Sequence, residues 1–66
     1  MTKKQQELYD FIKKYIKNYH RSPTIKELAT IFQRSVGSIH PMLKLLKKNG
    51  FIDFEKNTAR SIKILK

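Results

Sequence analysis

The stretch of sequence that most constrains the fold is RSVGSIHPMLKLLKKNG, residues 34–50. Ile39, Leu43 and Leu46 follow one another at offsets of four and three, so on a helix they share one face and can be buried together. Gly50 then supplies the residue that most easily adopts the left-handed conformation after a helix end. The stretch therefore predicts a helix whose rear is buried and whose other side is exposed.

The start of this helix is less regular than the rest. Gly37 costs up to about 1 kcal/mol relative to alanine inside a helix. Pro41 is tolerated only in the first turn, where its missing amide hydrogen has no partner to lose. Both are accommodated if regular helix begins late, near Val36 to Ser38, and Ser38 could then be the N-cap with Pro41 at the third helical position.

Polar side chains occupy the front of this helix, and lysines lie along its flank. Ser35, Ser38 and His40 are short enough to reach into a groove. Three lysines fall away from the apolar stripe: Lys44, Lys47 and Lys48. A helix with a buried rear, small polar residues at its start and cations beside them is typical of insertion into the DNA major groove. We therefore interpret it as a recognition helix.

The N-terminal part of the chain predicts a long helix over about residues 3–19. Thr2 and Gln5 fit a capping box, in which the threonine oxygen accepts from the amide three positions on. Apolar residues then recur at helical spacing: Leu8, Phe11, Ile12, Tyr15, Ile16 and Tyr19. We expect this helix to be structural, with its tyrosines in the core and their hydroxyl groups at the rim.

A second, shorter helix is predicted over about residues 25–32. Pro23 ends the preceding pattern, because the residue before a proline avoids helical backbone. Thr24 and Glu27 then form another capping box. A short helix, a short turn at residues 33–35 and a longer helix make the layout of a helix-turn-helix.

The period of the apolar residues changes from helical to alternating after residue 50. Residues 51–55 and 62–65 are typical of two short strands, and residues 56–60 of a polar turn between them. A hairpin directly after a recognition helix is the wing of a winged helix, and its tip carries side chains suited to phosphates or a minor groove: Lys56, Asn57, Thr58 and Arg60. The sequence therefore predicts a single domain over residues 1–66, mainly α with a small β-hairpin, in which three helices and a two-stranded wing form a winged helix-turn-helix.

Composition narrows the classes of function. Fifteen Lys and Arg against five Asp and Glu give a net charge of +10, which favours a polyanionic partner. There is no Cys, and the two His residues are twenty positions apart with few acids nearby, so we expect no disulfide, no metal site and no cofactor. No apolar run approaches the roughly 20 residues of a membrane span, so we expect a cytoplasmic, nucleoid-associated protein. We expect no enzyme, because no serine, histidine or acid has an organised catalytic partner.

The order of these features resembles the N-terminal DNA-binding domain of the LexA repressor family, especially its form from Gram-positive bacteria. The matching segments are QQEL at residues 5–8, FI at 11–12, SPTIKELA at 22–29, SIHPML at 38–43, GFI at 50–52 and RSIKIL at 60–65. They run almost from end to end of the chain, and it is their order and spacing together that carry the resemblance.

The resemblance implies a domain that binds double-stranded DNA in transcriptional regulation, with its third helix in the major groove. Four residues would meet base edges: Ser35, Ser38, Ile39 and His40. Ile39 would meet a thymine methyl only if its side chain is not fully buried. A larger set would meet the DNA backbone: Arg34, Lys44, Lys47, Lys48, Lys56, Asn57, Thr58, Arg60, Thr24 and Lys26. Since one module binds modestly, we expect a homodimer on a two-fold site.

The sequence also departs from the family. Gly37 stands where the family often has a polar residue, Pro41 replaces a groove-facing residue, and Phe32–Gln33 replaces a GL turn. LexA repressors carry a second, self-cleaving domain with a nucleophilic serine and a lysine base, and these 66 residues hold nothing able to perform that chemistry. An excised domain and a small stand-alone regulator of a phage or mobile element both fit this observation.

Two other classes of function stay open. A protein that binds single-stranded nucleic acid would need exposed aromatic side chains on a basic groove, and there are five candidates: Phe51, Phe54, Tyr9, Tyr15 and Tyr19. A module that binds a host or phage regulatory protein would need an exposed apolar patch away from the third helix.

Overall fold

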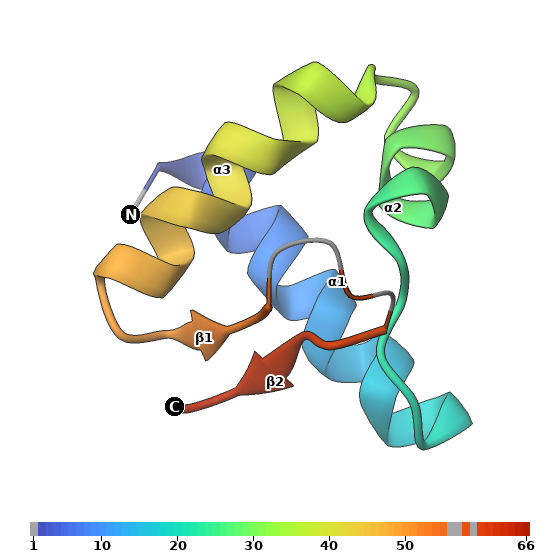
Figure 1. Ribbon diagram of the computed structural model, residues 1–66, viewed down its shortest axis with the longest axis vertical. Helices are drawn as coiled ribbons and strands as arrows, with labels where there is room; N and C mark the ends of the chain where they lie inside the picture. The colour runs from blue at the N-terminus through green and yellow to red at the C-terminus, as the bar shows by residue number, and fades with distance from the viewer. Residues whose placement is uncertain (1, 56–57, 59) are drawn as a thin grey trace.

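Within residues 2–55, 58 and 60–66, which the computed structural model describes, three helices are followed by a two-stranded antiparallel sheet. The elements are α1 (Lys3–Tyr19), α2 (Ile25–Ile31), α3 (Val36–Lys48), β1 (Ile52–Asp53) and β2 (Lys63–Ile64). Across the sheet, Ile52 pairs with Ile64 and Asp53 with Lys63. This order and arrangement confirm the predicted winged helix-turn-helix (Figure 1).

Both predicted capping boxes are present. The Thr2 hydroxyl accepts from the Gln5 amide at 3.2 Å, and the Gln5 side chain accepts from the Thr2 amide at 3.1 Å. At the start of α2, Thr24 and Glu27 make the same two bonds at 3.0 and 2.9 Å. These bonds satisfy amides that have no partner within the helix, so the sequence located the first residue of both helices correctly.

The first turn of α3 differs in detail from the expectation. The helix begins at Val36, inside the predicted interval, but its N-cap is Ser35 and not Ser38. The Ser35 hydroxyl accepts from the Ser38 amide at 3.2 Å, so the cap forms three residues earlier than expected. Pro41 consequently lies inside the helix and not in its first turn. At this position it removes one amide donor from the helix.

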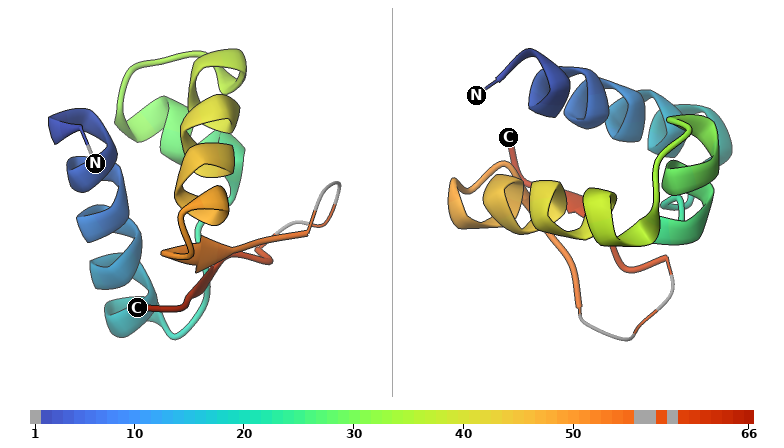
Figure 2. Two further views of the ribbon diagram at one scale, coloured as in Figure 1. Left: turned by 90° about the vertical axis from the view of Figure 1, so that its left-hand side faces the viewer. Right: turned by 90° about the horizontal axis from the view of Figure 1, so that it is seen from above.

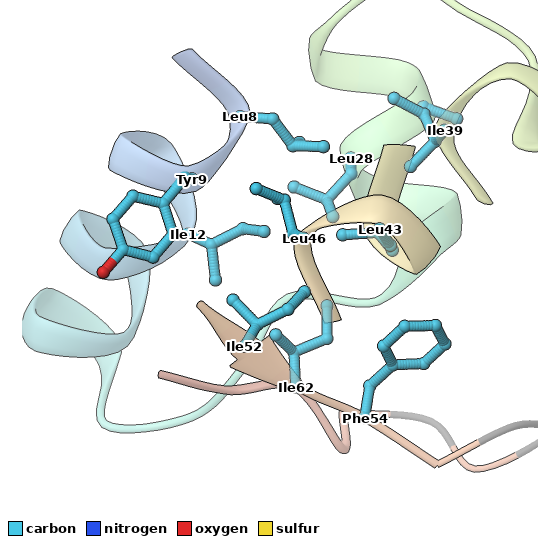
Figure 3. Close-up of a cluster of buried hydrophobic side chains, with 11 residues drawn as sticks. Leu8, Tyr9, Ile12, Leu28, Ile39, Leu43, Leu46, Ile52, Phe54 and Ile62 are labelled. Carbon is cyan, nitrogen blue, oxygen red and sulfur yellow. The ribbon is translucent and has the colours of Figure 1, made fainter. Parts of the chain in front are cut away.

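The buried core lies between all the elements (Figure 3). The rear of α3 contributes Ile39, Leu43 and Leu46, each with an exposed fraction of 0%, as the spacing of these residues predicted. The other helices and the hairpin supply the opposite walls: Leu8, Tyr9, Ile12, Leu28, Ala29, Ile52, Phe54 and Ile62. Because α3 is packed on its whole rear face, its rotation about its own axis is fixed.

The strands are shorter than the alternating pattern predicted. After α3, Gly50 takes a left-handed conformation with φ 79°, as expected, and the chain turns into β1. On the other side of the strands from the loop, the Leu65 amide still donates to the Phe51 carbonyl oxygen at 2.9 Å. On the loop side, side chains replace the backbone carbonyl groups of the partner strand as acceptors. Asp53 accepts from the Phe54 amide, and the hydroxyl of Ser61 accepts from the Glu55 amide. These bonds end the ladder early, since an amide already bonded to a side chain is not available across the hairpin.

The base of the hairpin lies beside α1, because the Tyr9 ring of α1 contacts the Phe51 ring at a centroid distance of 5.4 Å and the Tyr9 hydroxyl donates to the carbonyl oxygen of Lys66. The hairpin has a first leg, residues 51–55, and a second leg, residues 60–65, and Figure 2 shows both legs extending toward the loop on the side of α3 away from α1. None of the helices among the described residues is long and apolar enough to cross a membrane.

Candidate nucleic-acid interface

The side of α3 turned away from the core is exposed and carries two of the predicted lysines. We call it the outward face of α3 and define it by five exposed residues: Ser38, Pro41, Lys44, Leu45 and Lys48. They recur at offsets of three and four and form a continuous stripe opposite the buried rear. Three of the five residues are polar or basic, and Pro41 and Leu45 are apolar, so the outward face offers both hydrogen-bonding groups and positive charge to a partner.

The four residues predicted to meet bases have different surroundings. Ser35 and Ser38 are exposed, but the Ser35 hydroxyl caps α3 and also donates to Ser38 Oγ at 3.1 Å. His40 is half-buried, and its ring forms a T-shaped pair with the Phe54 ring at a centroid distance of 6.0 Å. Ile39 is fully buried. The condition set for a contact between Ile39 and thymine is therefore not met, because a side chain enclosed in the core cannot reach a base, and we assign Ile39 to the core.

The residues predicted to meet the DNA backbone fall into three groups. Five are exposed: Lys26, Arg34, Lys44, Lys48 and Thr58. In three others the side chain bonds to the protein, although Lys47 and Arg60 are also exposed: Thr24, Lys47 and Arg60. The remaining two, Lys56 and Asn57, lie outside the described residues. The sequence pattern could not separate the first two groups, since all eight residues are polar and fall between apolar positions.

Lys47 connects α3 to the first leg of the hairpin. Its Nζ donates to the carbonyl oxygen of Phe54 at 3.0 Å and lies 3.4 Å from Asp53 Oδ1. The same ammonium group lies over the Phe54 ring, 5.2 Å from the ring centroid, in a cation–π contact. Lys47 therefore contacts three groups on one short stretch of the hairpin.

Arg60 connects the second leg of the hairpin to the start of α2. Its guanidinium donates from Nη1 to Glu27 Oε1 at 3.1 Å and from Nη2 to Glu27 Oε2 at 3.2 Å. Nη1 also donates to the carbonyl oxygen of Ser22 at 3.1 Å. Sequence reasoning missed this contact because Glu27 and Arg60 lie 33 positions apart, and the only local signal at Glu27 was its capping box.

The charges of this pair are stabilised by their surroundings. The bond from the Thr24 amide, together with the Arg60 guanidinium, lowers the pKa of Glu27 from its ordinary value of 4.5. The Tyr15 hydroxyl, together with Glu27, raises the pKa of Arg60 further above its already high value. Both groups are therefore charged at neutral pH.

The aromatic side chains do not form a stacking platform on this side of the molecule. Tyr9 and Phe54 are buried, and Phe51 and Tyr15 are half-buried. Tyr19, at the end of α1, is 60% exposed, and Ile31 of α2 is 48% exposed. Both border a hollow of about 310 Å³ that is lined by residues of α1 and α2. Among the described residues, no three acids or histidines come together as metal ligands would.

A helix-turn-helix followed by a two-stranded wing, with a basic outward face on its third helix, defines the class of winged helix-turn-helix domains. Residues 1–61 match the family model described as LexA DNA binding domain, and the chain belongs to that family.

Several relatives described as LexA repressors match nearly the whole chain. The protein of Thermosipho melanesiensis is 36% identical over 66 residues, covering 100% of this chain and 33% of the relative. That of Colwellia psychrerythraea is 36% identical, covering 98% and 31%. That of Clostridium kluyveri is 30% identical over 63 residues, covering 94% and 31%. The chain thus spans about a third of the length of these relatives.

Proposed function

We propose that this chain binds double-stranded DNA and acts in transcriptional repression, with α3 in the major groove and the hairpin against the flanking backbone. The observation that carries this proposal is the arrangement of α3, whose rear is fully buried while its outward face presents Ser38, Lys44 and Lys48 to solvent. Membership of the LexA DNA binding domain family supports the same function.

Within this proposal, Ser38 and His40 read base edges. A serine hydroxyl donates and accepts, so Ser38 can meet any base, whereas the His40 imidazole, packed against the Phe54 ring, has a narrower range of orientations. Lys26, Arg34, Lys44 and Lys48 neutralise phosphates, since each is an exposed cation near the helix-turn-helix. Two copies on a two-fold site would place two such helices in successive major grooves.

The test is a titration of labelled duplex DNA with the 66-residue protein at several salt concentrations. With about four phosphates neutralised, one by each of these four exposed cations, the logarithm of the affinity falls with the logarithm of the salt concentration at a slope of about −3.6. Lys44→Gln is expected to reduce the slope by about 0.9. Lys4→Gln, which removes the same charge from α1, is the matched control and leaves the slope nearly unchanged. Binding that is absent or insensitive to salt would rule the proposal out.

The second candidate function is recognition of a regulatory protein, which the exposed Tyr19 and Ile31 favour. Tyr19 belongs to α1 and Ile31 to α2, and neither is part of the outward face of α3, so a partner could bind there independently of DNA. Lys44→Glu combined with Lys48→Glu separates the two functions. Loss of regulation together with duplex binding supports the first candidate, and retained regulation supports the second.

A further inference from the structure

Two of the cations that the sequence pattern assigns to phosphates are bonded within the protein: Lys47 of α3 bonds to the first leg of the hairpin, and Arg60 of the second leg bonds to the start of α2. Lys47 holds the first leg at Asp53 and Phe54, and Arg60 holds the second leg at Glu27 and Ser22. We infer that Lys47 and Arg60 are positioning residues that clamp the wing to α3 and α2, and that they do not contact phosphates. This inference rests on the proposed binding of duplex DNA.

Arg60 and Glu27 form a bidentate ion pair. Both nitrogens of the guanidinium fork meet both oxygens of one carboxylate, an arrangement that lysine cannot reproduce. The carboxylate is itself immobilised, because Glu27 Oε1 also accepts from the Thr24 amide at 2.9 Å in the capping box. One carboxylate therefore caps the start of α2 and holds the wing at the same time.

A second bond fixes the same leg. The amide of Ile62, two residues beyond Arg60, donates to Ser22 Oγ at 3.3 Å. The Ser22 side chain is buried, with an exposed fraction of 6% for the residue, and its hydroxyl donates to the Pro23 carbonyl oxygen. The segment before α2 thus receives two bonds from the second leg, one at Arg60 and one at Ile62.

The two clamps attach the wing to two different helices. Lys47 fixes the first leg to α3, and Arg60 fixes the second leg to the start of α2. Because α2 and α3 are the two helices of the helix-turn-helix, the clamps set how the wing stands relative to the outward face of α3. A phosphate contact by Arg60 would require it to give up three hydrogen bonds, whereas Lys44 and Lys48 have no protein partner among the described residues.

The experiment is a double-mutant cycle on Glu27 and Arg60, with duplex affinity measured at several salt concentrations. Glu27→Gln keeps an oxygen for the Thr24 amide, since capping boxes accept glutamine, but removes the charged fork partner. Arg60→Gln removes the guanidinium. Each single variant is expected to weaken binding about two- to five-fold, and the double variant is expected to be no weaker than Arg60→Gln. Removing the Glu27 charge alone would tighten DNA binding, so weakening by Glu27→Gln reports the clamp.

The salt dependence distinguishes a clamp from a phosphate contact. If Arg60 is a clamp, the slope of log affinity against log salt concentration for Arg60→Gln stays close to that for the Lys4→Gln control. The same slope is expected for Lys47→Gln. A phosphate contact by Arg60 would lower the slope by about 0.9. Arg60→Gln would then also weaken duplex binding at least as much in the Glu27→Gln background as in the unmodified protein, because the guanidinium is no longer shared with Glu27. Either of these results would overturn the inference.

Hydrogen exchange gives a readout that does not depend on DNA. In both single variants the Ile62 amide is expected to exchange several-fold faster, because its bond to Ser22 lies beside the broken clamp. Unchanged exchange at Ile62 would also overturn the inference. If the unmodified protein failed to bind duplex DNA, the proposed function would fail, while the Ile62 measurement would still decide whether the clamp exists.

Discussion

Truncation of Leu43 tests the rotation of α3, on which the proposed interface depends. Leu43 is fully buried among residues of every element, and Leu45, two positions along the same helix, is 44% exposed. Leu43→Ala removes buried methyl groups and leaves a cavity, which costs about 3 kcal/mol. A domain of this size is stable by only about 3–10 kcal/mol, so the variant would lose a large part of its stability. Leu45→Ala is the matched control and is expected to cost under about 1 kcal/mol, because leucine and alanine have similar helix propensities.

The assay is urea unfolding followed by far-ultraviolet circular dichroism. With an m-value of about 1 kcal/mol/M for a small domain, Leu43→Ala shifts the midpoint down by about 3 M or leaves the protein unfolded. Leu45→Ala shifts it by under about 1 M. Equal decreases of the urea midpoint in the two variants, or a larger decrease for Leu45→Ala, would refute the assignment of Leu43 to the buried face of α3. Since successive residues are about 100° apart on a helix, that result would also turn Ser38 and Lys44 away from solvent.

Three further predictions concern the caps, the turn and the pH dependence. Thr24→Ala removes the N-cap of α2 and should cost about 1 kcal/mol in urea unfolding, whereas Thr30→Ala, in the exposed last turn, should be nearly neutral. Gly50→Ala should destabilise by about 1–2 kcal/mol because φ is 79° there, while Gly37→Ala, in helical backbone with only an ordinary contact to Ser35 Oγ at 3.7 Å, should stabilise; loss at both would contradict this. The lowered pKa of Glu27 means that its contribution is complete above the ordinary value of 4.5 and is lost as pH falls through the folded-state pKa; acid titration of Glu27→Gln should therefore show a shallower loss of stability than the unmodified protein.

The features that the sequence predicted well depend on residues close together in the chain. Each capping box joins residues three apart, and the core stripe of α3 repeats every three or four residues. The N-cap of α3 was predicted less well, because Ser35 and Ser38 are both good capping residues and each lies near the start of the helical pattern. Because proline is avoided within helices, the sequence favoured Ser38 as the N-cap. In the structure the N-cap is Ser35, which accepts from the Ser38 amide, and the helix that follows buries Ile39.

The ends of the strands and the surroundings of the cations depend on contacts between distant residues. The Ile62 amide bonds to Ser22, 40 positions earlier, so no alternating pattern within the hairpin could have predicted where pairing stops. In the same way, Ile39 was a candidate for both the core and the interface, and only the packing of α1 and α2 against α3 decided between them.

The net charge of +10 therefore overstates the number of cations available to DNA. Two of the five acids, Glu27 and Asp53, pair with Arg60 and Lys47, and both cations are thereby held within the protein. Their pairing contributes modest stability, since exposed ion pairs are worth at most about 1 kcal/mol. Its larger effect is geometric, because it fixes the angle between the wing and α3. The salt dependence of duplex binding should accordingly follow the cations that face outward, such as Lys44 and Lys48, and not the total of Lys and Arg in the composition.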